Sequence, residues 1–362
     1  MVKRAALILA GGKARRFQTI DKVWQDKALA QLQGKPLLIH AVEAVFGVVD
    51  EVAVCVNDAQ RSEKYAQVLQ SHGLLDVKLV VDEQVAGVSG PNVALMSGLR
   101  AVNADYCFTL PCDMPFLQPK VAEYLFEEGE SCDIAVPMWP NGRLETLMMV
   151  LERNIALEIT QTLCVLKRPR SDDIPRGSGK TILVSPISHI KKLDPELKSF
   201  ININLREDLY KLRTRQSHGS ITEDLKLNLG NISISDLQLL QEGTRLQQEN
   251  KLAEAQSTFA VCVSNFEASN MYFWAGVSGE SQGEALLKLA RQLAEQKEAT
   301  RMDFEGKEVY YRAANNYCIE AQVYEENRCR LLEERALADK MWCESWAMGK
   351  AGHTHRYPSK IR

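Results

Sequence analysis

Residues 7–17 read LILAGGKARRF, and this short stretch holds three signals. An apolar run ends in two glycines, and the cations Lys13, Arg15 and Arg16 follow within four residues. Glycine lets the backbone approach a ligand closely, and successive N–H groups with basic side chains can hold phosphate oxygens. The stretch therefore predicts a strand that ends in a phosphate-binding turn. Alone it is a weak signal, and it lacks the glycine spacing of the dinucleotide fingerprint GxGxxG.

The composition is that of an ordinary globular protein with room for two domains. The 362 residues are 45% hydrophobic and 25% charged, with a net charge of −3. A charge near zero argues against a general nucleic-acid or membrane binder, so any positive site must be local. Nine cysteines without a CxxC pair indicate reduced thiols and a cytoplasmic protein. The apolar run near the N-terminus is too short for a signal peptide or a membrane span.

Up to about residue 215, short apolar runs alternate with helical stretches. The runs cover residues 5–10, 51–56, 77–81, 105–110, 133–137, 144–150, 181–184 and 200–203. The expected helices between them cover 36–46, 59–71, 92–102, 119–128 and 154–164. This alternation predicts an α/β domain with a mostly parallel sheet and helices on both faces. Such sheets bind ligands beyond the carboxyl ends of their strands, where the opening turn would lie.

The second half of the chain has a different period. We interpret the polar segment 213–231 as a linker, 232–350 as an all-α bundle, and 351–362 as a polar tail. A capping box of Ser235 and Gln238 would open the first helix.

The expected helical hairpins have two further marks. Glycines at 276–283 and 303–307 are expected to divide the helices into hairpin-sized pieces. Gly243, Ala255 and Phe259 match the spacing of small and aromatic positions in a tetratricopeptide repeat. Later segments do not repeat that pattern, and core packing explains most of these residues equally well.

Polar residues also follow several other runs of the first half. Asp82 ends a predicted strand, and Gly90 precedes a helix. Asp113 follows a strand directly between two prolines, where a carboxylate can hold Mg²⁺ against substrate phosphates. Asn202 and Asn204 are two apart in an extended run and would face the same side. Helix capping by the aspartate, and turn bonding by the asparagines, are the alternatives.

Taken in order, these stretches resemble the molybdenum cofactor guanylyltransferase family over residues 5–212. The matching pieces are LAGGKARR, DKALAQLQGKPLL, the segment with Asp82 and Gly90-Pro91, LPCDMPFL and ININLREDL. The resemblance implies a three-layer, Rossmann-like nucleotidyltransferase domain, here followed by a helical-hairpin, TPR-like domain. It also implies transfer of GMP from GTP to the phosphate of molybdopterin, with Mg²⁺ as cofactor and pyrophosphate as the second product.

The same resemblance assigns roles by position. The nucleotide would be bound by Leu9, Ala10, Gly11, Gly12, Lys13, Lys27, Asp82, Gly90 and Asp113. The expected catalytic residues are Lys27, Asp113 and Arg16, and the expected metal ligands are Asp113 and Asn204. Lys180 and Asn202 are expected in the acceptor pocket.

The sequence departs from the family pattern after Arg16. About five extra residues bring in two Asp-Lys pairs, so that either Lys22 or Lys27 is the active lysine. We favour Lys27 because the longer match, DKALAQLQGKPLL, begins at its pair. Cys55 stands where some members present an asparagine to the nucleotide.

Two further motifs of the sequence suggest sites that we do not expect to be functional. GKT within residues 175–184 lacks the first glycine of a P-loop, so we expect a flexible loop there. His353 and His355 are expected to be solvated rather than metal-bound.

Two functions are alternatives to guanylyl transfer. One is a related transfer reaction, such as cytidylyl transfer, and the other is that of a nucleotide-binding interaction protein. The helical domain would suit a cofactor carrier, an apoenzyme or a second copy of the chain, and no nucleic-acid or membrane partner is expected.

Overall fold

The computed structural model describes residues 2–12, 17, 26–209, 222–293 and 296–349. The chain divides into two compact units. Met1–Pro175 with Lys180–Leu227 form the sheet unit, and Arg176–Gly179 with Asn228–Arg362 form the helical unit. The boundary differs from the predicted linker at 213–231, because strand β10 (Leu225–Asn228) lies inside that range and joins the sheet. Residues 210–221 of that linker, and the tail with His353 and His355, lie outside the described residues.

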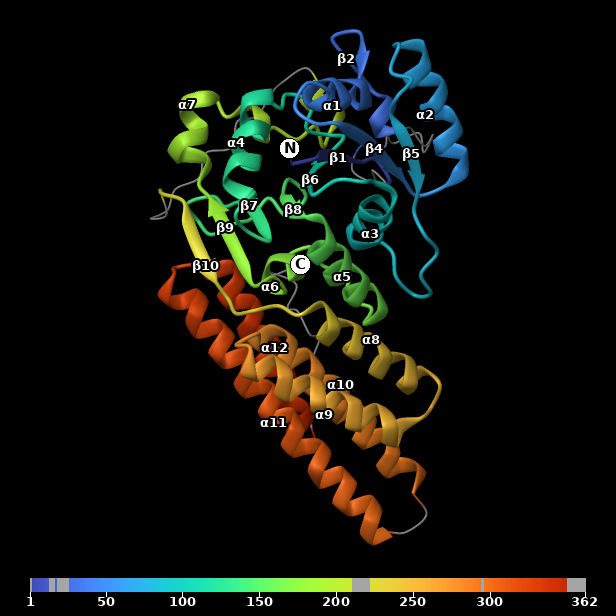
Figure 1. Cartoon of the computed structure of the whole chain (residues 1–362), viewed down its shortest axis with the longest axis vertical. Coiled ribbons are helices and arrows are strands. Elements are labelled where there is room, and N and C mark those ends of the chain that lie inside the picture. Colours follow the sequence, from blue (N-terminus) through green and yellow to red (C-terminus); the bar gives the residue numbers. More distant parts are fainter. Residues whose placement is uncertain (1, 13–16, 18–25, 210–221, 294–295, 350–362) are drawn as a thin grey trace. The chain divides into compact units, whose positions relative to one another are not determined.

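The sheet unit is built on an eight-stranded sheet of mostly parallel strands (Figure 1). β1 pairs in parallel with β4 and β6, whereas β8 runs antiparallel to β6 and β7. The strand order is β10-β9-β7-β8-β6-β1-β4-β5, with the bounds β9 Lys180–Val184, β7 Ile134–Pro137, β8 Val150–Glu152, β6 Tyr106–Pro111, β1 Arg4–Leu9, β4 Glu51–Val56 and β5 Lys78–Val81. A separate hairpin joins β2 (Gln31–Leu32) to β3 (Lys35–Pro36).

Two of the predicted strands differ from the structure. The run 144–150 contributes only its last residue to β8. The run 200–203 is not a strand: it follows a 3₁₀ turn, Lys198–Phe200, although Ile201 and Ile203 are buried as expected. The N–H of Ile203 donates instead to the carbonyl of Asp113 at 2.9 Å, which binds this segment to the end of β6.

Helices cover both faces of the sheet. The five predicted helices are confirmed to within one residue at each end, whereas two further short helices at 173–176 and 191–193 were not predicted. Ile8, Val54 and Phe108 share one buried cluster with helices α1, α2 and α4. On the other face Gly98 lets α3 approach closely, because a Cβ there would lie 2.7 Å from the sulfur of Cys55. The bounds are α1 Leu37–Val45, α2 Ala59–Ser71, α3 Pro91–Ala101, α4 Pro119–Gly129, α5 Arg153–Val165, α6 Asp173–Arg176 and α7 Lys191–Leu193.

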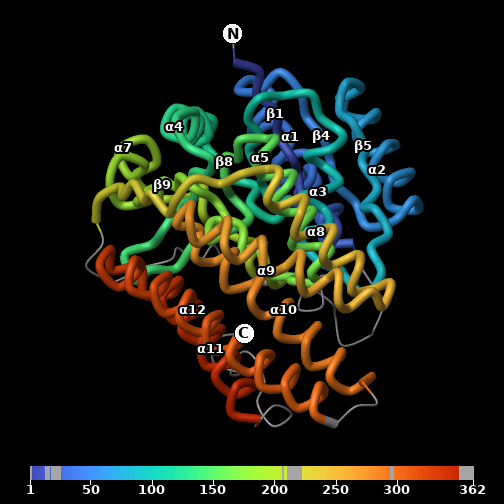
Figure 2. Tube along the Cα trace, turned by 60° about the horizontal axis from the view of Figure 1, so that its bottom comes forward, coloured from blue at the N-terminus to red at the C-terminus, as the bar shows by residue number. Residues whose placement is uncertain are grey.

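The described residues of the helical unit form five helices from α8 onward, each packed against the next along the chain (Figure 2). They are α8 Ile234–Gln248, α9 Leu252–Ala268, α10 Tyr272–Gln292, α11 Gln296–Glu326 and α12 Arg330–Ala347. Three of the connections hold one left-handed residue, Asn250, Asn270 or Arg328, which ends one helix and starts the next within three residues. Gly243 packs against the ring of Phe259, as the predicted hairpin requires.

The glycines of the helical unit do not break its helices, so that expectation is wrong. α10 runs straight through residues 276–283, and α11 runs through 303–307. Gly276 and Gly283 lie on one face of α10, where a Cβ would come within 2.7 Å of the rings of Tyr317 and Tyr310. Their absent side chains make room for the aromatic residues of α11. The cap of α8 also differs, since Ser233 rather than Ser235 accepts from the N–H of Asp236.

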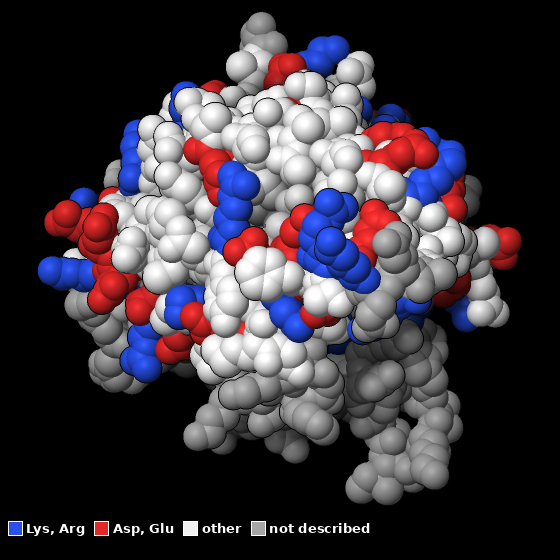
Figure 3. Space-filling model, turned by 90° about the horizontal axis from the view of Figure 1, so that it is seen from below, with Lys and Arg blue, Asp and Glu red and all other residues white. Residues whose placement is uncertain are grey.

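The strand predicted at 181–184 is confirmed as β9, which begins at Lys180, but the expectation of a flexible loop before it is wrong, because residues 175–179 are buried. All nine cysteines are free thiols. Among the described helices, none combines the length and apolar character that crossing a membrane would need. On the face drawn in Figure 3, lysine and arginine are interspersed with aspartate and glutamate over the described residues.

Candidate active site

The carboxyl ends of four parallel strands meet at one edge of the sheet. β1 ends before Gly11, β4 before Asn57, β5 before Asp82 and β6 before Asp113. All four residues line a cavity of about 630 Å³, which we call the main cavity. The position agrees with the general rule for ligand sites in open α/β sheets.

The opening turn forms one wall of the main cavity. Leu9 and Ala10 are held by the neighbouring strands: the N–H of Cys112 donates to the carbonyl of Leu9 at 3.1 Å, and that of Ala10 donates to the carbonyl of Cys55 at 2.9 Å. A Cβ on Gly11 would lie 3.3 Å from the nitrogen of Asn57, so the close approach favours glycine. Gly12 lines the cavity beside it. The expected residues Lys13 and Arg16, and the alternative lysine Lys22, lie outside the described residues.

Lys27, Asp113 and Asn204 are brought together as predicted. The Nζ of Lys27 donates to Oδ2 of Asp113 at 2.6 Å and to Oδ1 of Asn204 at 3.3 Å. The two side chains of the ion pair are only 13% and 23% exposed, so the pair is partly shielded from water. Asp113 does not cap a helix, since α4 begins later at Pro119 with Gln118 as its cap. This geometry favours an active-site role for the aspartate over the capping alternative.

A buried hydrogen-bond network, which the sequence did not predict, fixes Asp26, the residue next to Lys27. Oδ1 of Asp26, the residue before the lysine, accepts from the hydroxyl of Tyr65 at 2.9 Å. Oδ2 of Asp26 lies 3.4 Å from Nε of Arg61. Arg61 also donates to the carbonyl of Gly12 at 3.2 Å, so it joins the opening turn to the Asp-Lys pair. The sequence carries little signal of this contact, because it depends on where α2 packs.

Asp82 is the most perturbed acid of the main cavity. Burial raises its pKa from 3.8 to about 6. Its Oδ1 is buried and accepts no hydrogen bond from any described residue. A buried carboxylate without donors is costly, so a ligand that supplies N–H groups would stabilise it.

The first turn of α3 forms the opposite wall of the main cavity. Gly90, with φ +125°, stands directly before the helix, as expected, and this conformation favours glycine. Val85, Val88 and Pro91 add apolar side chains to the lining of the main cavity, which also contains Lys27 and Asp113. The cavity therefore offers both apolar and charged groups to a ligand.

Asn57 is a second residue that sequence analysis missed. It lines the main cavity and accepts a hydrogen bond from Arg61 at 2.9 Å. Cys55, two residues earlier, is fully buried within β4, and burial raises the pKa of its thiol. The rule that ligand-binding residues follow strand ends would have pointed to Asn57.

A smaller cavity of about 230 Å³, here called the side cavity, adjoins the first at Asp113. Asn202 lines it together with Arg143 and Thr146. Lys180 is not brought to either cavity. It begins β9 at the amino edge of the sheet, where its N–H donates to Asp133, whereas both cavities lie at the carboxyl edge.

The oxygen donors beside Lys27 fit a magnesium ion. Oδ2 of Asp113 and Oδ1 of Asn204 both accept from the ammonium group of Lys27, which lies between them, and both are oxygen donors of the kind that magnesium binds. Among the described residues there is no cluster of three or more His, Cys, Asp or Glu that could enclose a metal. Magnesium bound with substrate phosphates needs only one or two carboxylates, so the small donor set is sufficient.

This site is that of a nucleotidyltransferase. It combines a glycine turn, a lysine–aspartate pair and two adjoining cavities at the carboxyl edge of a mixed sheet. Residues 6–171 match the family model described as the MobA-like NTP transferase domain. A curated protein of Methanosarcina acetivorans, named "Probable molybdenum cofactor guanylyltransferase", is 33% identical over 208 residues, which are 57% of this chain and 88% of the relative. The chain belongs to the MobA-like NTP transferase family.

Two further proteins are similar to this chain over part of its length. A protein of the same printed name from Pyrococcus horikoshii is 32% identical over 213 residues, 58% of this chain and 98% of the relative. The crystal structure of molybdopterin-guanine dinucleotide biosynthesis protein A from Archaeoglobus fulgidus covers 57% of this chain and 95% of its own, at 23% identity and a TM-score of 0.47.

Proposed function

We propose that the sheet unit transfers GMP from GTP to the phosphate of molybdopterin and releases pyrophosphate, in a reaction that requires Mg²⁺. The observation that carries this proposal is the contact of Lys27 with Asp113 at the junction of the two cavities. A triphosphate in the main cavity and an acceptor in the side cavity would meet there. The names of the relatives supply the acceptor.

Guanine is the base that fits Asp82 best. Its N1–H and N2–H groups are adjacent donors, which one carboxylate can accept together. Cytosine and adenine each offer a single amino group in the corresponding place. The buried oxygen of Asp82, which accepts no hydrogen bond from the described residues, supports GTP over the other nucleotides.

The acceptor phosphate attacks the α-phosphorus of GTP as pyrophosphate leaves on the opposite side. A phosphate is already an anion, so no general base and no covalent intermediate are needed. Lys27 lies beside Asp113 and would neutralise charge on the triphosphate as the leaving group departs. Asp113 and Asn204 would hold magnesium, which supplies positive charge for the nonbridging and leaving oxygens.

Two residues of the side cavity suit the acceptor. Arg143 is exposed at its mouth and can pair with a phosphate, whereas Asn202 can donate to a polar ring edge. We therefore propose Arg143 and Asn202 as acceptor residues, without Lys180.

Isotope labelling tests the proposal. With molybdopterin and Mg²⁺, label in the α-phosphate of GTP should appear in the acceptor product, and label in the γ-phosphate should appear in pyrophosphate. Transfer of the γ-label to the acceptor would instead show a kinase. Absence of transfer from any nucleotide, with binding retained, would favour an interaction protein.

A further inference from the structure

One face of helix α2 contacts two separate pieces of chain that line the main cavity. Arg61 and Tyr65 lie four residues apart in α2, so their side chains share a face. The guanidinium of Arg61 donates to the carbonyl of Gly12 at 3.2 Å, and its Nε lies 3.4 Å from Oδ2 of Asp26. The hydroxyl of Tyr65 donates to Oδ1 of Asp26 at 2.9 Å and lies 3.4 Å from the carbonyl oxygen of Ala10. The helix therefore joins the opening turn to the residue before the active lysine.

Arg61 acts on the main cavity from outside it. It is not among the described residues that line the cavity, whereas Gly12, Asp26 and Asn57 are. Nη1 of Arg61 donates to Oδ1 of Asn57 at 2.9 Å, in addition to its contact with Gly12. The side chains of Arg61 and Asp26 are only 9% and 11% exposed, so their ion pair is shielded from water. Any effect of Arg61 on a ligand would therefore pass through the residues that it holds.

The contacts with α2 fix the direction of two backbone carbonyl groups. A carbonyl oxygen carries partial negative charge and would repel phosphate oxygens if it faced them. Arg61 and Tyr65 hold the carbonyl oxygens of Gly12 and Ala10 towards the helix. We therefore expect the opening turn to keep these oxygens away from a triphosphate.

Arg61 also balances a buried negative charge beside the active lysine. Oδ2 of Asp26 is buried and accepts no hydrogen bond from the described residues, and Arg61 is its ion-pair partner. A buried carboxylate that loses its partner is strongly unfavourable and would repel a nearby anion. Asp26 directly precedes Lys27, the residue expected to contact the triphosphate. The loss of Arg61 should therefore disturb the site where the phosphates would bind.

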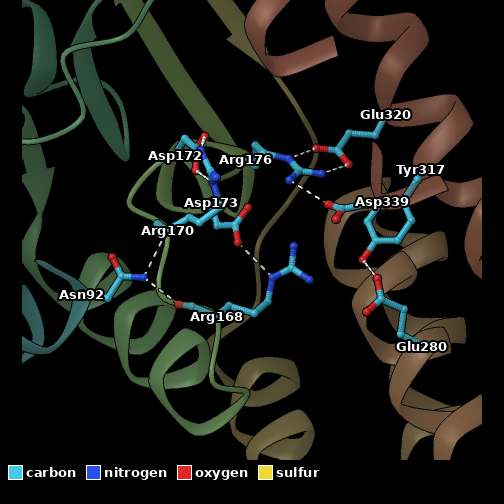
Figure 4. A network of polar contacts seen from close by, with 10 residues as sticks. All are labelled: Asn92, Arg168, Arg170, Asp172, Asp173, Arg176, Glu280, Tyr317, Glu320 and Asp339. Carbon is cyan, nitrogen blue, oxygen red and sulfur yellow. Dashed lines mark hydrogen bonds and ion pairs between the residues drawn. The ribbon is translucent and has the colours of Figure 1, made fainter. Parts of the chain in front are cut away.

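Two other buried arginines of the chain are paired with carboxylates that lie elsewhere (Figure 4). Arg168 donates to Asp173 at 2.9 Å within the sheet unit, and Arg176 donates to Glu320 at 2.7 Å within the helical unit. Neither carboxylate lines the main cavity or the side cavity. The partners of Arg61, rather than its burial, are therefore what connects it to the site.

We propose that Arg61 is a positioning residue for the triphosphate of the nucleotide. It holds the opening turn and Asp26 so that the turn and Lys27 can contact the same phosphates. The base would bind at Asp82, which follows β5, and so should depend much less on Arg61. This inference rests on the proposed function only in requiring that a nucleoside triphosphate binds in the main cavity.

The test compares Arg61→Lys with the wild type in the full chain, in the presence of Mg²⁺. Lysine keeps the positive charge but lacks the planar fork, so a loss of affinity would report geometry rather than attraction. We expect the dissociation constants for inorganic triphosphate and GTP to rise about tenfold, as when a hydrogen bond to a charged group is lost. The dissociation constant for guanosine should stay within about twofold, which a general loss of structure would not allow.

Arg168→Lys is the matched control. Arg168 and Arg61 are each 7% exposed, and each is paired with an aspartate of the same unit. Arg168→Lys should lower the melting temperature in the way that Arg61→Lys does, and it should leave the affinity for inorganic triphosphate unchanged. An equal loss of triphosphate affinity in both variants would show a structural role alone and would overturn the proposal.

Tyr65→Phe keeps the proposal testable if Arg61→Lys does not fold. It removes only the hydroxyl that contacts Asp26 and Ala10, and it should weaken the binding of inorganic triphosphate about threefold without changing that of guanosine. An unchanged triphosphate affinity in folded Arg61→Lys, or in Tyr65→Phe where Arg61→Lys does not fold, would overturn the proposal, as would an equal loss for guanosine.

The same measurements separate this proposal from the proposed function. A wild-type protein that binds GTP and triphosphate but transfers no GMP would contradict the proposed function, and the variants would still test Arg61. A wild-type protein that binds neither GTP nor triphosphate would overturn both.

Discussion

At the scale of single residues, the site depends on side chains that are far apart in sequence. Lys27 and Asp113 are 86 positions apart, and yet their charged atoms are 2.6 Å apart. The sequence pointed to Asp113 because it directly follows a predicted strand, and to Lys27 through the family resemblance of DKALAQLQGKPLL. It also favoured Lys27 over Lys22, and Lys27 does lie beside Asp113.

Asp113→Asn should abolish turnover while it leaves nucleotide binding largely intact. The substitution removes the negative charge that faces Lys27 and that would hold magnesium, and these contacts matter most as charge moves to the leaving group. We expect kcat to fall by roughly a hundredfold or more, with a much smaller change in the GTP dissociation constant. Lys180→Ala, at the opposite edge of the sheet, is the control and should retain activity. Near-normal transfer by Asp113→Asn would refute the assignment.

The raised pKa of Asp82 predicts that pH changes the stability of the protein and its affinity for GTP in opposite directions. Its pKa is about 6 in the folded protein and near 3.8 when exposed, so the folded state binds the proton more tightly. The contribution of Asp82 to the stability of the free protein should therefore fall as pH rises from about 4 to 6, so Asp82→Asn should gain stability relative to the wild type over this range. Melting temperatures across this range provide the measurement.

The affinity for GTP should instead increase as pH rises. The ionised carboxylate is the form that accepts N–H groups, so GTP should bind more weakly as pH falls below about 6. Asp82→Asn should bind GTP weakly at every pH. A wild-type affinity that is flat between about pH 5 and 7 would show that Asp82 does not meet the base.

At the scale of helices and strands, the periodicity of the sequence predicted the positions of the helices well. It did not show which glycines end a helix. The helices α1 to α5 were predicted to within one residue at each end, because their apolar faces cover a buried sheet, whereas the short helices α6 and α7 were not predicted. The glycines of α10 were misread as breaks, since a glycine that ends a helix and one that admits a ring look alike in sequence. Only the packing of Tyr310 and Tyr317 distinguishes them.

Gly283→Ala tests that packing through the sign of its effect. Helix propensity alone would stabilise the alanine variant by about 1 kcal/mol. A Cβ there would lie 2.7 Å from the ring of Tyr310, and such overpacking costs roughly 1–3 kcal/mol. We expect a net loss, measured as a lower urea midpoint of unfolding. Gly47→Ala, where a Cβ meets nothing within 4 Å, is the control, and a stabilised Gly283→Ala would contradict the packing.

At the scale of the whole molecule, the sequence predicted two domains and the class of the first. The motif order was specific enough for the α/β domain, its glycine turn and the residues Asp82 and Asp113. It could not predict Arg61, Tyr65 or Arg176, because long-range packing rather than local spacing gives those residues their partners. The same limit explains why residues 175–179 were expected to form a flexible loop and are instead buried.

The most direct test of the account is pyrophosphate release by the full chain with each of the four nucleoside triphosphates, with and without molybdopterin, in the presence of Mg²⁺. We expect release only when GTP and molybdopterin are present together, because guanine satisfies Asp82 and the acceptor supplies the attacking phosphate. Release with another nucleotide and molybdopterin would contradict the assignment of guanine. Binding of GTP without release under any of these conditions would contradict the central claim that this protein is a guanylyltransferase.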